Sequence, residues 1–262
     1  MIYNIALIGY GYWGPKLARN FHNSPKFNIK YIVDKSKNNI NKAKLDFPLS
    51  ILLNDFKKIK KDTINLVVIS TPTKTHFSIA KYFLKFTNVL IEKPLSLNSK
   101  DVFALEKIAK NNKNLLFVDY PFIFSGSINY VKKIIDSKKY GSLTEIESFR
   151  EQAPVRSDAD VVWDLGVHDI SILKYLLNSK LNKVNSLKYN TINNQKKDTA
   201  YINLLYKNNV KVFIKNSWIS PIKVRLIKFK FRNAIIFCDE NEPIYKLKIY
   251  TRSKNNKNNY KL

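Results

Sequence analysis

The sequence predicts an α/β protein: a doubly wound parallel sheet comes first, and an α+β domain with a large, mostly antiparallel sheet follows. Short apolar, β-branched runs alternate with helix-length segments over the first 120 residues. Beyond them, strand-like segments follow one another with short polar turns between them. With 262 residues, the chain is long enough for two domains.

The first domain is expected at residues 1–120. Its strands are predicted at residues 3–9, 28–34, 64–71, 88–93 and 114–120, and its helices at 13–23, 36–46, 74–86 and 99–112. The strand segments are almost entirely apolar, which is typical of parallel strands that are buried on both faces. The order strand, helix, strand therefore indicates βαβ units.

The second domain is expected at residues 121–262. Helices are predicted at 127–139 and 161–177, and strands at 143–151, 183–190, 199–206, 210–217, 224–231, 234–239 and 245–251. Turns such as Lys207-Asn208-Asn209 indicate antiparallel hairpins. We expect helices on only one face of this sheet.

The open face of that sheet suggests an assembly. Phe213, Trp218, Phe229 and Phe231 lie on or beside the predicted strands. An uncovered aromatic sheet face is more often an interface than a wet surface. We therefore expect a homodimer or a homotetramer formed through the C-terminal sheet.

Composition excludes several classes of protein. The single cysteine, Cys238, excludes a disulfide framework and is typical of the reducing cytoplasm. No apolar run reaches the ~18 residues of a membrane span, and the first ten residues are strand-like and not a signal segment. The histidines and Cys238 lack the spacing of a zinc site. We expect a cytoplasmic protein without a membrane partner or a metal.

The net charge of +26 allows two interpretations. A strong positive field is typical of proteins that bind nucleic acids or membrane surfaces. A Lys-, Asn- and Ile-rich composition spread along the chain gives the same charge without such a partner. Because the lysines form no single block and no Arg-aromatic pattern, we expect no specific nucleic-acid partner. The field would favour an anionic substrate.

The first strand runs into GYGYWG at residues 9–14, which has GxGxxG spacing. Gly9 allows a tight turn, Gly11 lets the backbone approach a pyrophosphate, and Gly14 lets the helix pack closely. Asp34 ends the second strand, twenty residues after Gly14, where a carboxylate for the ribose hydroxyls is expected. A glycine-rich turn and a surface Asp are the alternative.

This pattern predicts a Rossmann domain that binds NAD. The expected cofactor residues in the loop and after the second strand are Gly9, Gly11, Tyr12, Trp13, Gly14 and Asp34. Asp34 favours NAD because a carboxylate repels a 2′-phosphate. Lys35 and Lys37 soften that preference and leave NADP open.

Two further strands end in polar residues at the edge where open α/β sheets bind ligands. The residues expected at the cofactor there are Ser70, Thr71, Pro72, His76, Glu92 and Lys93. The alternative for Thr71-Pro72 is a helix start. Lys93 precedes a proline, which favours an extended chain that points toward the cleft; the alternative is a solvated lysine at the strand end.

The segment VVWDLGVHDISILKYLL, residues 161–177, predicts a helix with Asp164, His168 and Asp169 in its first turns. Residues i and i+4 share a helix face, so Asp164 and His168 can converge on one point. A histidine with a reference pKa near ~6.5 can exchange a proton near neutral pH. Alternatively, Asp164 is an N-cap and His168 is a half-buried structural residue.

Together, GYGYWG (9–14), STPTKTH (70–76), EKP (92–94) and WDLGVHDISIL (163–173) resemble the Gfo/Idh/MocA oxidoreductases over essentially the whole chain. The closest similarity is to the branch that acts on nucleotide-linked sugars, such as UDP-N-acetyl-sugar 3-dehydrogenases. The resemblance implies NAD(P)-dependent hydride transfer to or from a secondary hydroxyl or ketone of a sugar. It also implies that Lys93, Asp164 and His168 form the catalytic group. The alternative is a non-catalytic dinucleotide-binding homologue.

The chain departs from this branch at two points. Tyr120 stands where a histidine often follows the Asp of the sixth strand, and we expect it at the substrate. Family members usually run longer, so the second domain is expected to be shortened at its C-terminus. Arg150 and Arg156 are expected to grip a carboxylate or diphosphate, with ordinary surface arginines as the alternative. Asp169 is expected beside the substrate in a supporting or dipole-related role.

Overall fold

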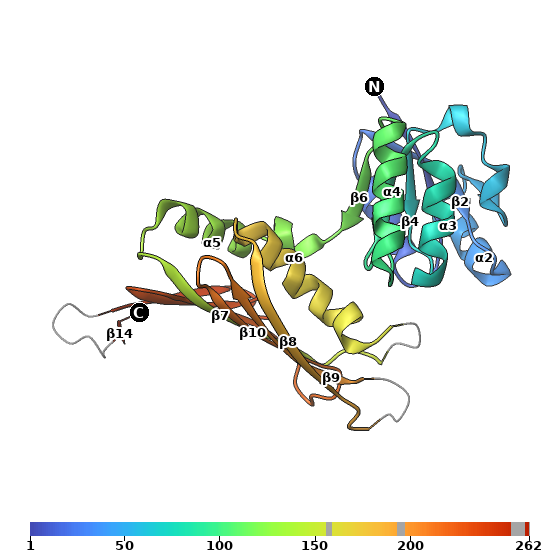
Figure 1. The fold of residues 1–262 in the computed structure, drawn as a ribbon. Coiled ribbons are helices and arrows are strands. Elements are labelled where there is room, and N and C mark those ends of the chain that lie inside the picture. Colours follow the sequence, from blue (N-terminus) through green and yellow to red (C-terminus); the bar gives the residue numbers. More distant parts are fainter. Residues whose placement is uncertain (156–158, 193–196, 253–259, 262) are drawn as a thin grey trace. The chain divides into compact units, whose positions relative to one another are not determined.

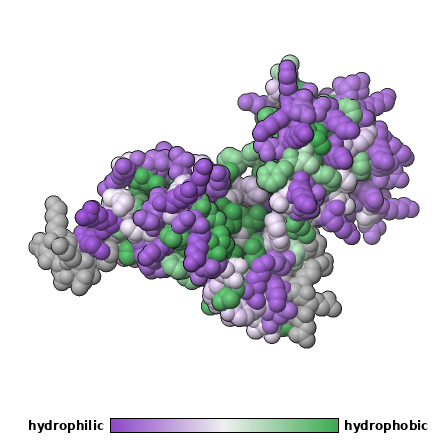
Figure 2. Space-filling model, in the orientation of Figure 1, coloured by the Kyte–Doolittle hydropathy of each residue, from purple (hydrophilic) through white to green (hydrophobic). Residues whose placement is uncertain are grey.

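The computed structural model describes residues 1–155, 159–192, 197–252 and 260–261. The chain divides into two compact units, Met1–Asp119 and Tyr120–Leu262, and each has its own sheet and core (Figure 1). Hydrophilic side chains cover most of the visible surface of the first unit (Figure 2). No helix in the described residues is long and apolar enough to cross a bilayer.

The first unit is a doubly wound α/β layer. Its sheet has the order β3-β2-β1-β4-β5-β6 and every neighbouring pair is parallel. The strands are β1 (Tyr3–Ile8), β2 (Phe27–Val33), β3 (Ile51–Leu53), β4 (Leu66–Ile69), β5 (Asn88–Glu92) and β6 (Leu116–Asp119). The helices are α1 (Gly14–His22), α2 (Lys37–Asp46), α3 (Thr73–Phe83) and α4 (Ser99–Asn111).

Apolar clusters lie on both faces of this sheet. Residues of α1 and α2, such as Ala18 and Ala43, pack against one face, and residues of α3 and α4, such as Phe83 and Leu105, pack against the other. This two-sided burial explains why the strand segments are apolar throughout, and it confirms the predicted fold class. Two 3₁₀ turns, Phe56–Lys58 and Lys61–Thr63, join β3 to β4. The three-residue strand β3 was not predicted, because it is too short to show a period.

The second unit has an eight-stranded sheet in the order β14-β13-β12-β11-β7-β10-β9-β8 among the described residues. Only β7 and β10 pair in parallel; the other neighbouring pairs are antiparallel. The strands are β7 (Leu143–Glu151), β8 (Leu181–Tyr189), β9 (Thr199–Tyr206), β10 (Lys211–Ser217), β11 (Val224–Phe231), β12 (Ala234–Asp239), β13 (Leu247–Arg252) and β14 (Tyr260–Lys261).

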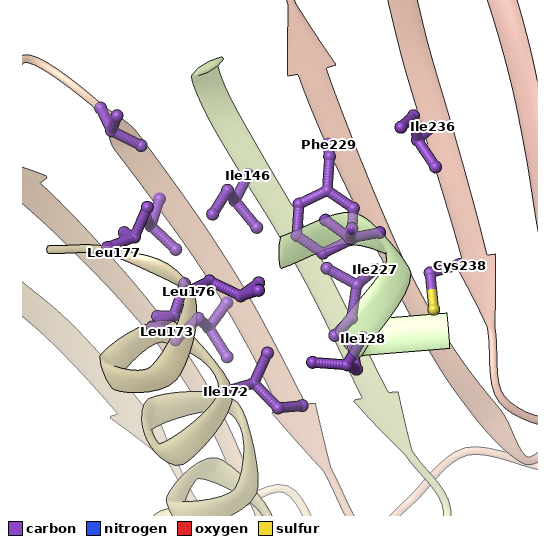
Figure 3. Packing of buried hydrophobic residues seen from close by; sticks show 14 of the residues in the cluster. Ile128, Ile146, Ile172, Leu173, Leu176, Leu177, Ile227, Phe229, Ile236 and Cys238 are labelled. Carbon is purple, nitrogen blue, oxygen red and sulfur yellow. The ribbon is translucent and has the colours of Figure 1, made fainter. Parts of the chain in front are cut away.

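Helices α5 (Gly126–Ser137) and α6 (Val167–Leu176) cover one face of this second sheet. A 3₁₀ turn (Pro121–Phe124) precedes α5, and a π-helical turn (Val162–Gly166) runs into α6. The core between helices and sheet contains Ile128 of α5, Leu173 of α6 and Phe229 of β11 (Figure 3). The predicted α+β second domain is therefore confirmed.

The aromatic residues expected on the open face mostly lie elsewhere. Phe229 and Phe231 are buried in the core beneath the helices, and Trp218 is buried beside the π turn. Because side chains alternate along a strand, Lys228 and Lys230 take the open face, where they pair with Glu145 and Glu147 of β7. Of the four aromatics, only Phe213 is exposed, at 41%. The expected homodimer or homotetramer through this face stays a prediction, and a soluble monomer seen by light scattering would contradict it.

Candidate active site

The loop between β1 and α1 contains two glycines that the fold requires and one that it does not. Gly9 has a φ of +99°, and a Cβ there would lie 2.7 Å from the Ser70 backbone. A Cβ on Gly14 would lie 2.2 Å from the carbonyl oxygen of Gly9. Around Gly11, by contrast, no described atom outside the glycine and its two chain neighbours lies within 4 Å of the Cβ position. The open space beside Gly11 fits the approach of a dinucleotide pyrophosphate.

Asp34 is fixed at the end of β2 beside this loop. Its Oδ2 accepts from the backbone N–H of Tyr10 at 2.6 Å, and its Oδ1 accepts from that of Ser36 at 2.8 Å. The amide of Asn39 also donates to Oδ2, at 3.1 Å. A half-buried carboxylate with a fixed orientation can still accept hydrogen bonds from a ribose diol on its remaining lone pairs. Asp34 is thus built into the loop and is not a solvated surface residue.

Tyr12 and Trp13 project from the same loop, and Lys16 lies over both rings. The Lys16 Nζ is 3.7 Å from the Tyr12 ring centroid and 4.2 Å from that of Trp13. Sequence reasoning missed Lys16, although a cation three residues after an exposed aromatic on a helix start is a signal for such a contact. This group presents a positive charge beside the glycine loop.

The residues after β4 hold neighbouring loops together. The Ser70 hydroxyl donates to the carbonyl oxygen of Gly9 at 2.8 Å, and the hydroxyls of Thr71 and Thr75 are 2.7 Å apart. Helix α3 begins at Thr73 with Pro72 as its N-cap, so Thr71-Pro72 does mark a helix start. Ser70 therefore fixes the glycine loop through its hydroxyl proton.

His76 does not have the free ring nitrogen that a direct cofactor contact needs. Its side chain is 1% exposed, its Nδ1 lies 3.0 Å from the carbonyl oxygen of Pro94, and its Nε2 lies 2.8 Å from that of Thr71. Both nitrogens are therefore used to join the loop after β4 to the loop after β5. The tertiary structure buries His76 as a link between these loops, and its expected place at the cofactor stays a prediction.

Glu92 and Asp119 form an acid pair at the ends of β5 and β6. The two residues are partners in the parallel register of these strands. Burial, together with the neighbouring Asp119 carboxylate, raises the pKa of Glu92 to about 7. Burial also raises the pKa of Asp119. The Glu92 Oε2 accepts from the backbone N–H of Lys93 at 3.2 Å, so the acid pair adjoins the predicted catalytic lysine.

In the second unit, a π-helical turn places Asp164. The side chain of Asp160 accepts from the backbone N–H groups of Val162 and Trp163 at 3.0 and 3.1 Å, so Asp160 and not Asp164 caps this turn. Asp164 is 6% exposed, and its Oδ2 accepts from the indole Nε1 of Trp218 at 3.0 Å. Single π turns occur frequently at functional sites. The N-cap alternative for Asp164 is therefore excluded.

His168 lies at the start of α6 and is 9% exposed. Its ring meets that of Phe122 edge-on, with centroids 5.0 Å apart. The i to i+4 interval from Asp164 to His168 spans the junction between the π turn and α6. The second unit thus brings two buried, ionisable side chains to the first turns of one helix.

Arg150 and Asp169 are paired inside the second unit. The Arg150 Nε lies 3.1 Å from Asp169 Oδ1, and the two side chains are 3% and 1% exposed. Ser148 and Asn216 also donate to the Asp169 carboxylate, at 2.9 and 2.8 Å. The Arg150 guanidinium lies 4.4 Å from the centroid of the Phe122 ring. Both side chains are enclosed and pair within the second unit. The expected grip of Arg150 on a substrate carboxylate or diphosphate and the expected supporting role of Asp169 stay predictions.

Two other predicted substrate residues have different outcomes. Tyr120 is half-buried directly after β6, and burial raises the pKa of its hydroxyl. Arg156 lies outside the described residues. Sequence reasoning missed Asp119, Trp218 and Asn216, because their relevance arises from strand pairing and side-chain packing that no local motif shows.

Comparison with known proteins gives two family matches. Residues 3–120 match the model of an oxidoreductase family with an NAD-binding Rossmann fold, and residues 128–232 match the GFO/IDH/MocA C-terminal domain. Together these matches cover most of both units.

Curated relatives include dehydrogenases. Uncharacterized oxidoreductase YrbE of Bacillus subtilis is 23% identical over 80% of this chain and 66% of its own length. Inositol 2-dehydrogenase of Rhizobium meliloti is 29% identical over 44% of this chain and 37% of its own. UDP-N-acetylglucosamine 3-dehydrogenase of Acidithiobacillus ferrooxidans is 28% identical over 42% of this chain and 34% of its own. The matched regions thus span about two thirds or less of these relatives.

Solved structures share the fold. UDP-N-acetylglucosamine 3-dehydrogenase GnnA from A. ferrooxidans gives a TM-score of 0.85 at 20% identity, over 96% of this chain and 80% of that one. GenD2 from gentamicin A biosynthesis, solved in complex with NAD, gives 0.87 at 16% identity, over 97% and 76%. At such low identity these similarities establish the fold alone.

Proposed function

Because the chain belongs to the Gfo/Idh/MocA oxidoreductase family and its first unit is an NAD-binding Rossmann domain, we propose that it is a sugar dehydrogenase. It would transfer a hydride between NAD and a secondary hydroxyl or ketone of a sugar. The observation that carries this proposal is the buried Asp164 and His168 at the start of α6. Burying two ionisable groups is costly, and such groups are typical of catalytic sites.

The first unit would hold the cofactor. When bound, the nicotinamide of NAD supplies the hydride acceptor for a carbinol carbon. The space beside Gly11 would receive the pyrophosphate, with the positive end of α1 and Lys16 nearby. Asp34 would accept from the ribose hydroxyls. Tyr12, Trp13, Ser70, Thr71, Pro72, Glu92 and Lys93 are the other residues that we assign to the cofactor side.

The proposed proton chemistry uses three side chains. His168 would take the proton of the sugar hydroxyl as a general base, and Asp164 would orient the imidazole and stabilise its charged form. Lys93 would donate a hydrogen bond to the same oxygen and stabilise developing alkoxide charge. In the reverse reaction, His168 would return the proton to the ketone oxygen.

We propose a nucleotide-linked sugar as the substrate. UDP-N-acetylglucosamine 3-dehydrogenase is among the relatives, and the net charge of +26 favours an anionic diphosphate over a neutral cyclitol. Inositol 2-dehydrogenase is also a relative, so a cyclitol is the direct competitor.

The test is NAD reduction, followed at 340 nm, with a panel of UDP-sugars and with myo-inositol. We expect turnover with a UDP-N-acetyl sugar or its uronic acid. Turnover with inositol alone would overturn the substrate class. NAD binding without turnover of any member would favour a non-catalytic homologue.

Gly11→Val is the matched control for this measurement. A Cβ at this position has open space around it, apart from the two chain neighbours, so we expect an unchanged melting temperature together with loss of NAD binding and of the 340 nm signal. A Gly11→Val protein that still binds NAD normally would remove Gly11 from the cofactor site.

A further inference from the structure

Trp218 follows β10 directly and is buried against the π turn. It is 4% exposed and packs with Val161, Leu165 and Ala200. Its backbone N–H donates to the carbonyl oxygen of Asp198 at 2.9 Å. The indole is therefore held by apolar packing and by its own backbone, and its N–H points at the Oδ2 of Asp164.

The end of β10 meets the π turn and α6 at two further points. The Asn216 amide donates to Asp169 at 2.8 Å. A Cβ on Gly166 would lie 2.7 Å from Asn216 Oδ1, so only glycine allows this approach. The end of β10 and the residue after it thus contact Asp164 and Gly166 of the π turn and Asp169 of α6.

Tryptophan suits this place for a physical reason. The indole N–H is a donor only and carries no charge, so it can satisfy a buried carboxylate oxygen without neutralising it. A hydrogen bond to an ionised acceptor is also stronger than one between neutral groups. The Trp218 indole therefore binds the Asp164 carboxyl group without adding a charge beside it.

We propose that Trp218 is a positioning residue that fixes the Asp164 carboxylate through its indole N–H, so that Asp164 can stabilise protonated His168. This inference rests on the proposed catalytic roles of Asp164 and His168. Trp218 itself touches neither substrate nor reacting atoms in this scheme.

The first test needs no substrate. The chain has three tryptophans, so three indole N–H signals are expected in a ¹⁵N NMR spectrum and can be assigned by single Trp→Phe variants. We expect the Trp218 N–H to exchange with solvent far more slowly than that of Trp163, and Asp164→Asn to shift the Trp218 signal. A Trp218 signal unchanged by Asp164→Asn would overturn the inference.

The second test is single-turnover hydride transfer from UDP-N-acetylglucosamine to NAD. Trp218→Phe keeps an aromatic ring and removes the N–H, and we expect a rate about 10- to 100-fold lower, as for loss of a hydrogen bond to a charged group. The KM for the sugar and the Kd for NAD should stay within about 2-fold. Trp163→Phe, beside Asp164 in the π turn, is the matched control and should leave all three values unchanged.

A double-mutant cycle separates positioning from packing. If Trp218 acts through Asp164, Trp218→Phe should lower the rate no further in an Asp164→Asn background. An equal loss in both backgrounds would show a packing role and overturn the inference. If Trp218→Phe fails to fold, benzothienylalanine at this position replaces only the N–H by sulfur and makes the same comparison.

The outcomes also distinguish this inference from the proposed function. An Asp164→Asn protein with wild-type turnover would overturn the catalytic role of Asp164 and the inference with it. An impaired Asp164→Asn with a fully active Trp218→Phe would overturn the inference alone.

Discussion

In the first unit, Glu92 and Asp119 lie beside each other at the ends of β5 and β6, whereas in the second unit Asp164 and Asp169 lie among hydrogen-bond donors. Burial, together with the neighbouring Asp119 carboxyl group, raises the pKa of Glu92 to about 7. In the second unit, Asp169 has Arg150, Ser148 and Asn216 around it, and Asp164 has Trp218. The two buried acidic sites therefore differ in their surroundings: another carboxyl group in the first unit, and hydrogen-bond donors in the second.

The first unit thus places two acids side by side, whereas the second pairs an acid with a cation. Two carboxyl groups that share a site hold one proton between them over part of the pH range. The Asp169 carboxylate has both oxygens engaged by a buried guanidinium and two neutral donors, which holds these side chains in place. Each of the following predictions tests one side of this comparison.

The largest expected effect concerns the residues that we propose to act on the sugar hydroxyl. Removing an acid–base group typically slows the chemical step ~10²–10⁴-fold, so His168→Ala and Lys93→Met should each lower the single-turnover rate by that order. The double variant should be little slower than the slower single one, because the two residues act as a unit. Asp164→Asn should fall between wild type and His168→Ala.

NAD affinity and melting temperature are measured on the same proteins. Near-normal hydride transfer in His168→Ala, with only a lower melting temperature, would return His168 to a structural role. It would also remove the catalytic explanation for the burial of Asp164 and His168 in the second unit.

The next effect concerns the buried ion pair of Arg150 and Asp169. Arg150→Met removes the cation and leaves Asp169 buried, so we expect a loss of about 3–5 kcal/mol in the free energy of unfolding, measured with urea. Lys228→Met, which removes a lysine from a pair on the open sheet face, is the control and should cost at most about 1 kcal/mol. Equal losses would show that the Arg150 pair is no more than an ordinary surface pair.

The smallest effect distinguishes the acid pair by its pH dependence. The folded pKa of Glu92, about 7, lies above the ordinary value of 4.5, so the folded state binds a proton that the unfolded state releases between these values. The stabilisation is complete below pH 4.5 and is lost as the pH rises to 7. A shift of this size corresponds to roughly 3 kcal/mol.

Glu92→Gln should remove this dependence. Urea unfolding of both proteins at several pH values from 4.5 to 8 measures the difference between them. If that difference does not change with pH, Glu92 and Asp119 do not share a proton, and the contrast between the two units disappears.

Some features of this protein were determined by local sequence. Apolar runs predicted the parallel strands because strands buried on both faces have no polar side to show. The GxGxxG spacing and Asp34 predicted the cofactor loop. The turn, the start of the helix after it and the end of the next strand all lie within a short stretch of chain. The stretches containing Lys93, Asp164 and His168 also carried the family resemblance.

Other features were decided only by tertiary structure. Alternation along β11 puts Phe229 and Phe231 on one face, but only the packing of α5 and α6 determines that this face is the core. His76, Arg150 and Asp169 carry groups that suit ligand binding, and packing instead gives each of them partners inside the protein. Asp119 pairs with Glu92, 27 positions away, and Trp218 donates to Asp164, 54 positions away. Such pairings depend on strand register and chain crossing, which the composition and period of a single segment do not encode.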